Sequence, residues 1–205
     1  MSDFYEKYWQ ERRKSGSRPR YRIFFGWIVP ETSVLDIGCG DGYFGEMLVR
    51  DKRVKYQGGD ISEEGLKIAR ARGLNVIKLN AEIDLPKFES GSFDYVIMSE
   101  FIEHVVNSEQ IILEALRIAR RGVLLSIPNV AYWKYRLQLL GGRFPKQWEF
   151  APHEHLRFWS IKDFQYMAEA LGVNIKGFKA SNGKPILRDI WPNLFGFQIC
   201  FFLQK

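Results

Sequence analysis

The sequence predicts an α/β fold: a doubly wound, mostly parallel seven-stranded sheet with an antiparallel C-terminal strand. Two observations lead to it. Short apolar runs alternate with amphipathic helical patterns through most of the 205 residues, as in a parallel sheet covered on both faces. The last two apolar runs have no crossover helix between them, which suits an antiparallel pair. The length fits a single domain with one substantial core.

Two helices are expected before the first strand. Aromatic residues recur at helical spacing over residues 3–14, and Ser15-Gly16-Ser17 then interrupts the pattern. A second stripe, of large apolar side chains, runs from Tyr21 to Pro30. These two segments form an N-terminal helical arm over residues 1–30.

Seven apolar runs predict the strands of the sheet, at residues 33–37, 54–59, 76–79, 93–98, 123–127, 174–180 and 197–203. Helical patterns between them predict helices at residues 43–50, 63–72, 109–119, 130–140 and 161–171. Ser62 and Ser108 stand where side-chain caps are expected, and Ser160 with Asp163 resembles a capping box. Gly73 and Gly172 are expected to end two of these helices.

A glycine-rich loop follows the first strand directly. Gly38, Gly40 and Gly42 let the backbone turn sharply and approach a ligand without Cβ atoms in the way. The next helix directs its first N–H groups at the same place. Asp60, at the tip of the second strand, is suited to hold the two vicinal hydroxyls of a ribose. The arrangement predicts a nucleoside-binding βαβ unit.

The details of this loop favour one class of nucleoside. A dinucleotide fingerprint needs a third glycine where the chain has Tyr43. Asp36 would repel a pyrophosphate but suits the ammonium and sulfonium groups of S-adenosylmethionine (SAM). A dinucleotide such as NAD or FAD, and a purely structural glycine turn, remain the alternatives.

Residues Asp36 to Gly42 resemble motif I of the class I SAM-dependent methyltransferases, and residues 92–105 are similar to another segment of that family. The resemblance implies a single methyltransferase domain over residues 1–205, with an acceptor-side insertion at residues 130–159. It implies transfer of a methyl group from SAM to a small or medium-sized acceptor. The cofactor-binding residues that we expect are Asp36, Gly38, Cys39, Gly40, Gly42, Asp60, Ile61, Asn80, Ala81, Ser99 and Glu100.

Some of these positions have competing interpretations. Asn80 and Ala81 lie where the family contacts adenine, but the family usually has Asp in place of Asn80. The alternative is that Asn80 is only a polar residue at the start of a loop. Ser99 and Glu100 lie at the carboxyl end of the fourth strand, where open α/β sheets bind ligands. Glu100 and His104 are four residues apart, which would place them on one helical face.

The three histidines, His104, His153 and His155, are the candidates for a catalytic base, because imidazole titrates near neutral pH. The alternatives are a helix-capping role for His104 and loop architecture for the other two. His153 to Ser160 is similar to an element that many small-molecule methyltransferases carry over the acceptor. No metal is expected, because no nearby Cys or third His completes a zinc set.

Within the class, residues 120–129 and the run from Trp133 to Arg143 resemble the MetW group of methionine biosynthesis proteins. That resemblance implies a second hypothesis, an accessory protein that binds SAM and acts on a homoserine acyltransferase. Residues 132–148 would be its docking surface.

The net charge of +6 raises a third hypothesis, RNA methylation. Six basic residues fall between positions 12 and 22, either as a phosphate-binding surface or as a solvated helix end. The sequence motifs of exocyclic-amine and cytosine C5 methyltransferases are missing, so nucleic acid is the less favoured partner.

No apolar run approaches a membrane span, the N-terminus is too polar for a secretory signal, and two cysteines offer no disulfide framework, so we expect a cytoplasmic protein.

Overall fold

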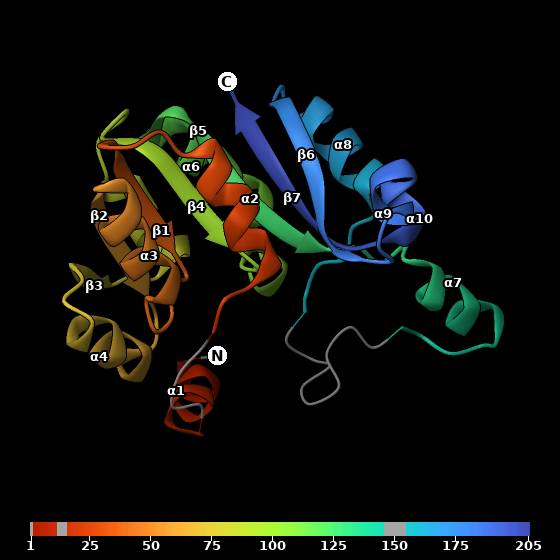
Figure 1. Ribbon diagram of the computed structural model, residues 1–205, viewed down its shortest axis with the longest axis horizontal. Helices are drawn as coiled ribbons and strands as arrows, with labels where there is room; N and C mark the ends of the chain where they lie inside the picture. The colour runs from red at the N-terminus through yellow and green to blue at the C-terminus, as the bar shows by residue number, and fades with distance from the viewer. Residues whose placement is uncertain (1, 12–15, 146–154) are drawn as a thin grey trace.

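The computed structural model describes residues 2–11, 16–145 and 155–205. In these ranges one seven-stranded sheet has the order β3-β2-β1-β4-β5-β7-β6 (Figure 1). Its strands are β1 Ser33–Ile37, β2 Lys55–Asp60, β3 Val76–Lys78, β4 Phe93–Ser99, β5 Ala119–Pro128, β6 Asn174–Gly183 and β7 Gly196–Gln204. The first five strands pair with one another in parallel, and β7 is antiparallel to both β5 and β6. The predicted fold class is confirmed.

The helices of the described ranges are α1 Ser2–Glu11, α2 Pro19–Trp27, α3 Tyr43–Lys52, α4 Glu63–Ala71, α5 Ala81–Asp84, α6 Ser108–Ile118, α7 Trp133–Leu140, α8 Ile161–Ala170, α9 Leu187–Ile190 and α10 Pro192–Phe195, with 3₁₀ turns η1 Leu85–Lys87 and η2 Ile102–His104. Among them we find no helix with the length and apolar character that a bilayer crossing needs. α1 lies apart from the sheet and packs beside α4 (Figure 1).

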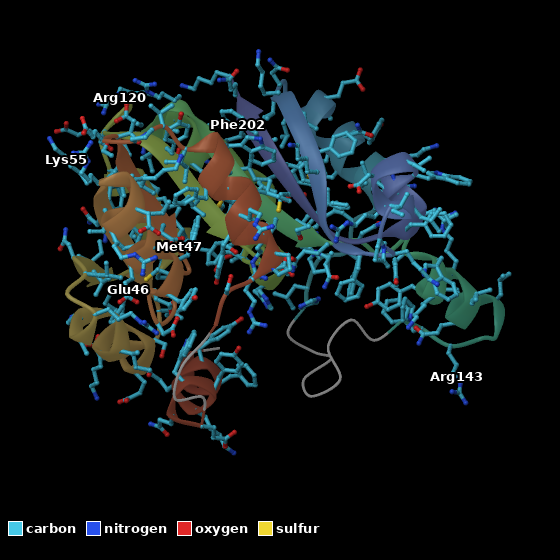
Figure 2. All side chains as sticks on the ribbon, in the orientation of Figure 1. Glu46, Met47, Lys55, Arg120, Arg143 and Phe202 are labelled. Atoms are coloured by element: carbon cyan, nitrogen blue, oxygen red, sulfur yellow. The ribbon has the colours of Figure 1, made fainter. Side chains whose placement is uncertain are left out.

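The sheet is covered on both faces because its central strands alternate their side chains between two cores. Val96 and Met98 of β4 belong to one cluster with residues of α5, α6 and α8. Tyr95 and Ile97 belong to the other cluster with residues of α2, α3 and α4. Phe202 of β7 lies against α2 (Figure 2), where its ring stacks on Trp27 with the centroids 5.9 Å apart.

Two of the three predicted caps are confirmed and one is wrong. The Ser62 hydroxyl accepts from the Gly65 amide at 3.2 Å, and Ser160 forms the full capping box with Asp163. Ser108 is not a cap, because Asn107 takes the N-cap position and Ser108 is already the first residue of α6. The Ser108 hydroxyl instead donates to the neighbouring Glu109 carboxylate at 3.0 Å.

The expectation that no helix separates the last two strands is also corrected. α9 and α10 lie between β6 and β7, but each has only four residues. Such single turns are too short to produce a visible helical period in the sequence. Neither turn carries the chain across the sheet, so β6 and β7 still pair antiparallel as predicted.

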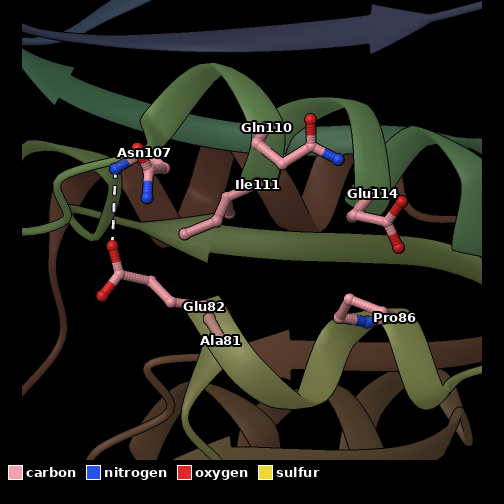
Figure 3. Close-up of a pocket in the computed structure, with 7 residues that line it drawn as sticks. All are labelled: Ala81, Glu82, Pro86, Asn107, Gln110, Ile111 and Glu114. Atoms are coloured by element: carbon pink, nitrogen blue, oxygen red, sulfur yellow. Dashed lines mark hydrogen bonds between the residues drawn. The ribbon is translucent and has the colours of Figure 1, made fainter.

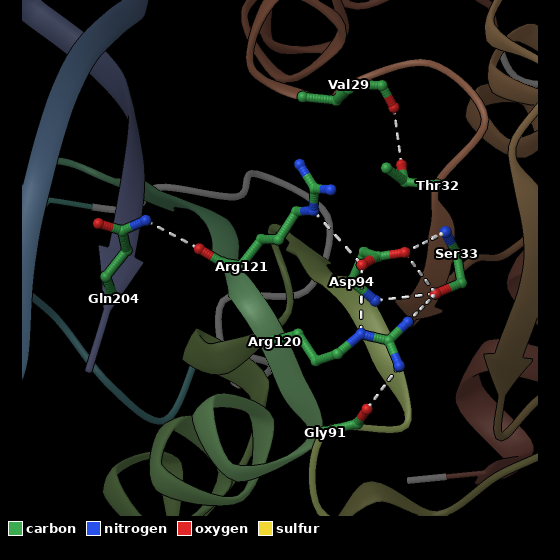
Figure 4. Close-up of polar contacts among 8 residues, drawn as sticks. All are labelled: Val29, Thr32, Ser33, Gly91, Asp94, Arg120, Arg121 and Gln204. Carbon is green, nitrogen blue, oxygen red and sulfur yellow. Dashed lines mark hydrogen bonds and ion pairs between the residues drawn. The ribbon is translucent and has the colours of Figure 1, made fainter.

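Asp94 ties three elements together at the amino ends of β1, β4 and β5 (Figure 4). One carboxylate oxygen accepts from both the amide and the hydroxyl of Ser33, each at 2.9 Å. The other oxygen pairs with Arg120 at 3.2 Å and Arg121 at 3.4 Å. Burial by itself would raise the pKa of Asp94, but the Ser33 hydrogen bonds and the Arg120 guanidinium outweigh it and lower the pKa to about 2.

We therefore expect an acid-labile contribution of about 2 kcal/mol to the free energy of unfolding from Asp94. Its pKa is lower in the folded chain than in the unfolded chain, so this contribution is complete above about pH 4 and disappears as the pH falls toward 2. Urea unfolding of Asp94→Asn at pH 7 should show a loss of this size. The same variant at pH 2 should match the parent chain, and a pH-independent difference would contradict the assignment.

Candidate functional site

The glycine loop lies between β1 and α3, at the carboxyl ends of the strands. Gly38, Gly40 and Gly42 all have positive φ angles, of 75°, 54° and 72°. The Gly38 and Cys39 amides donate to the carbonyl of Gly59 at 2.8 and 3.2 Å, which ties the loop to β2. On the other side, the Arg72 guanidinium pairs with Asp41 of the loop. The loop is therefore held from both sides in a conformation that favours glycine.

Asp60 fastens this loop from the end of β2. One carboxylate oxygen accepts from the Gly40 amide at 2.8 Å and the other accepts from the Ser62 amide at 2.9 Å. The side chain is buried, and burial raises its pKa against the lowering effect of these amides. Each carboxylate oxygen has a second lone pair, so both remain able to accept from a ribose hydroxyl. The sequence did not indicate the link between Asp60 and Gly40.

Asp36 is buried beneath the same loop and has a partner that sequence reasoning missed. The hydroxyl of Tyr56, on β2, donates to its carboxylate at 2.9 Å. Burial raises the pKa of Asp36 to about 7, because the hydrogen bond from Tyr56 only partly offsets the loss of solvation and the Asp60 carboxylate adds repulsion. No sequence motif marks Tyr56, whose role depends on the parallel pairing of β1 with β2.

At the end of β4, the Ser99 side chain and the Glu100 backbone amide have hydrogen-bond partners. The Ser99 hydroxyl accepts from the Arg20 guanidinium at 2.6 Å, so Arg20 turns inward although it belongs to the basic run. The Glu100 amide donates to the Ser126 hydroxyl at 3.0 Å, and Glu100 has a positive φ of 53°. The expected shared helical face of Glu100 and His104 is wrong, because only residues 102–104 form a single 3₁₀ turn.

Asn80 and Ala81 lie after β3 as expected, but the Asn80 side chain has a structural task. Its oxygen accepts from the Glu82 amide at 3.1 Å and so caps α5. Ala81 is buried at the start of that helix, and Ile61 is half-buried next to Asp60. This use of the side-chain oxygen supports the alternative interpretation, in which Asn80 is a polar residue at the start of the loop.

A pocket of about 260 Å³ lies between α5, η1 and α6 (Figure 3). Its lining residues are Ala81, Glu82, Pro86, Asn107, Gln110, Ile111 and Glu114. The Glu82 carboxylate bridges this pocket by accepting from the Val106 and Asn107 amides. None of the lining residues belongs to the glycine loop or to the end of β2, but Ala81, one of the expected cofactor-binding residues, lines the pocket.

Helix α1 covers the glycine loop. A Cβ on Gly40 would meet the Trp9 ring at 2.3 Å, and Trp9 also lies against Gly65. The Glu6 carboxylate accepts from the Glu63 and Glu64 amides at 2.8 and 2.9 Å, at the positive end of α4. These amides lower the pKa of Glu6, chiefly the amide of Glu64.

Removal of the Glu6 charge should release α1. We expect Glu6→Gln to speed trypsin cleavage after Lys7 several-fold at pH 7, because the amides of α4 lose a charged acceptor. The rate would be followed by mass spectrometry. Glu89→Gln is the control, since it removes an exposed carboxylate that lies away from α1 and from Lys7. Equal rates for the two variants would show that Glu6 does not hold α1.

The described histidines meet in space although they are far apart in sequence. The ring centroids of His104 and His155 lie 4.8 Å apart, and the centroid of the Tyr5 ring of α1 lies 6.1 Å from that of His104. Burial is the larger cause, and the nearby His104 the smaller one, of the lowering of the pKa of His155 to about 4. His155 is therefore neutral at pH 7. His153, the third predicted base, lies outside the described residues.

This combination of sheet order, glycine loop and acidic residue at the end of β2 defines the class I SAM-dependent methyltransferases, and the chain is a member of that class. The loop, with its positive-φ glycines and two buried carboxylates, fits the cationic nucleoside SAM, the cofactor of the class. More narrowly, the chain belongs to the family of the methionine biosynthesis protein MetW, whose family model matches residues 18–203.

Solved structures support the fold. The magnesium protoporphyrin IX methyltransferase of Synechocystis PCC 6803, solved with bound SAH, has a TM-score of 0.69 at 15% identity and covers 100% of this chain and 98% of its own. A putative methyltransferase of Haloferax volcanii, solved in complex with its Trm112 activator, has a TM-score of 0.71 at 16% identity and covers 98% and 96%.

Two curated relatives are similar in sequence. The bifunctional methionine biosynthesis protein MetXA/MetW of Rhodopirellula baltica is 31% identical over 188 residues, which are 82% of this chain and 30% of that protein. The chain therefore spans less than a third of this relative's length. A ubiquinone biosynthesis O-methyltransferase of Chromobacterium violaceum is 27% identical over 164 residues, or 76% of this chain and 70% of the relative.

Proposed function

We propose that the chain transfers a methyl group from SAM to a small or medium-sized acceptor, within one methyltransferase domain over residues 1–205. The observation that carries this proposal is the position of Asp60, which holds the Gly40 amide and lies at the end of β2. The described residues of the arm over residues 1–30 cover the cofactor, and those of residues 130–159 form the acceptor side. Residues 12–15 and 146–154 lie outside the described parts of the chain. Bound SAM supplies an electrophilic methyl group on a sulfonium.

The cofactor roles follow from the carboxyl ends of four strands. Asp60 accepts from the ribose hydroxyls, and Ile61 packs beside it. The carboxylate of Asp36 attracts the cationic methionine end, together with Ser99 and Glu100 from β4. Loop residues Gly38, Cys39, Gly40 and Gly42 present their backbone to the nucleoside, and Asn80 and Ala81 border the adenine. Holding an acceptor against the methyl carbon supplies about 7–11 kcal/mol of the barrier.

The imidazoles of His104 and His155 are the groups that accept the acceptor's proton, with His153 as a further candidate. His155 is neutral at pH 7, but a pKa of about 4 makes it a weak base. The pair therefore suits an acceptor whose hydroxyl is already acidic. The name of the Chromobacterium violaceum relative, an O-methyltransferase, supports an oxygen acceptor.

The test is formation of S-adenosylhomocysteine (SAH) from SAM with fractionated cell extract as the acceptor source. We expect the small-molecule fraction to support product formation, and Asp60→Ala to abolish it. Asp51→Asn, an exposed carboxylate on α3, is the matched control. Activity confined to the RNA fraction would favour the RNA hypothesis, and SAM binding without turnover in any fraction would contradict the proposed transfer.

A second candidate is an accessory role beside an acyltransferase, as the MetW resemblance implies. It is favoured by the MetXA/MetW relative, which carries both proteins in one chain. The exposed apolar end of α7 favours it too. Leu137, Leu140 and Phe144 are 57%, 85% and 65% exposed. Arg143 lies beside them, at the far end of this projecting segment (Figure 2).

Co-purification with a homoserine acyltransferase tests this candidate. The double change Leu137→Ser and Leu140→Ser should remove the complex, because the exposed leucines would form its apolar core. Tyr166→Ser on α8 is the control, since Tyr166 is also exposed, at 76%. Retention of the complex by the leucine variant would exclude α7 as the docking surface.

A further inference from the structure

Three side chains with metal-ligating atoms meet beside the end of β4. Glu103, His104 and His155 each place one such atom within 4.8 Å of the others. The Glu103 carboxylate lies 4.0 Å from Nε2 of His104. No metal was expected from the sequence, because no nearby Cys or third His completes a zinc set; Glu103 and His104 are distant in the chain from His155.

The backbone explains why the three groups meet. The Glu103 carbonyl accepts from the Leu156 amide at 2.7 Å and from the Arg157 amide at 3.2 Å. The Arg157 guanidinium also donates to the Val106 carbonyl. The segment that carries His155 is therefore fastened to η2, so the cluster is built by the fold rather than by flexible surface side chains.

Glu103 is the observation that indicates a ligand. Its side chain is only 1% exposed, and neither carboxylate oxygen has a hydrogen-bond partner in the described parts of the chain. An oxygen of the nearby Glu100 is likewise buried and unpaired there. Buried carboxylates without hydrogen bonds are costly, and proteins normally keep them only when they are paired or coordinate a metal.

We propose that Glu103, His104 and His155 bind a divalent transition-metal cation, with Glu100 as a further negative charge beside it. The cation satisfies the unpaired carboxylate and offsets the repulsion between two adjacent acidic groups. One carboxylate and two imidazoles suit Mn²⁺, Fe²⁺, Co²⁺ or Zn²⁺ rather than Mg²⁺ or Ca²⁺, which prefer all-oxygen sites.

Three protein ligands leave coordination positions open for an outside oxygen. A cation here would draw in an acceptor through its hydroxyl and lower the pKa of that hydroxyl. With the cation bound, His104 and His155 would act as its ligands and not as bases. This catalytic use rests on the proposed methyl transfer, whereas the binding of the cation does not. The two are therefore tested separately.

The test is titration of the chelator-treated full chain with Co²⁺, followed by its visible absorption. We expect saturation at one cation per chain, with affinity reduced more than about 100-fold in Glu103→Gln and in His155→Ala, since even outer-sphere changes cost roughly 10–100-fold. Glu169→Gln, an exposed carboxylate on α8, should bind like the parent. The chain without metal should be less stable than Glu103→Gln, because the variant removes a buried carboxyl group that lacks hydrogen-bond partners among the described residues.

Several outcomes would overturn the proposal. Failure of the parent chain to bind Co²⁺ is one, and undiminished binding by Glu103→Gln is another. Loss of binding in His153→Ala with retention in His155→Ala would also contradict it. SAH binding by each variant controls for folding, and normal Co²⁺ binding without any methyl transfer would leave the site intact while removing the proposed function.

Discussion

Asp60→Ala should weaken SAH binding about 100-fold or more. The carboxylate is expected to accept from two ribose hydroxyls, and hydrogen bonds to a charged group contribute about 1.5–3 kcal/mol each. It also holds the Gly40 amide, so its loss removes one of the hydrogen bonds that tie the glycine loop to β2. Isothermal titration with SAH measures the effect directly.

Two comparisons make this experiment specific. Asp60→Asn should fall between the parent and Asp60→Ala, because an amide oxygen still accepts one hydrogen bond but carries no charge. Asp51→Asn should bind like the parent, since Asp51 pairs with Arg50 on the exposed side of α3. Unchanged affinity in Asp60→Ala, with an intact circular dichroism spectrum, would remove Asp60 from the cofactor site.

Asp36→Asn should stabilise the cofactor-free protein while weakening its affinity for SAM. The pKa of Asp36 is raised from an ordinary value near 3.8 to about 7, because the folded chain resists a buried negative charge. Between pH 4 and pH 7 the unfolded chain loses this proton while the folded chain keeps it. The parent therefore loses about 4 kcal/mol of stability over this range. The amide in the Asp36→Asn variant carries no charge, so the variant avoids this loss.

The measurement is the thermal midpoint of both chains from pH 4 to pH 8. The two midpoints should be close at pH 4 and should diverge as the pH rises, with the parent the lower. Titration of SAM at pH 6.5 in buffers of different ionisation enthalpy should show proton release from the parent and not from Asp36→Asn. Equal midpoints at pH 8 would show that the Asp36 charge is not costly to bury.

Much of the architecture was predictable because it depends on local patterns. Apolar runs placed all seven strands to within a few residues, except that β5 is longer at its amino end and β6 at its carboxyl end. The glycine spacing of residues 38–42 indicated the turn that the positive φ angles confirm. The error at Ser108 is a shift of one residue in where α6 begins. The turns α9 and α10 were missed because four residues are too short a stretch for a periodic signal.

The site was predictable only in part. The sequence by itself determined the fold class, the glycine loop and the acidic residue at the end of β2, because each is encoded by neighbouring residues. Only the tertiary structure decided that Tyr56 donates to Asp36, that Arg20 turns to Ser99, and that His155 meets Glu103. These contacts join segments that are 20 to 79 residues apart. Their geometry comes from strand pairing and from the docking of one segment on another, and no local pattern of residues records it.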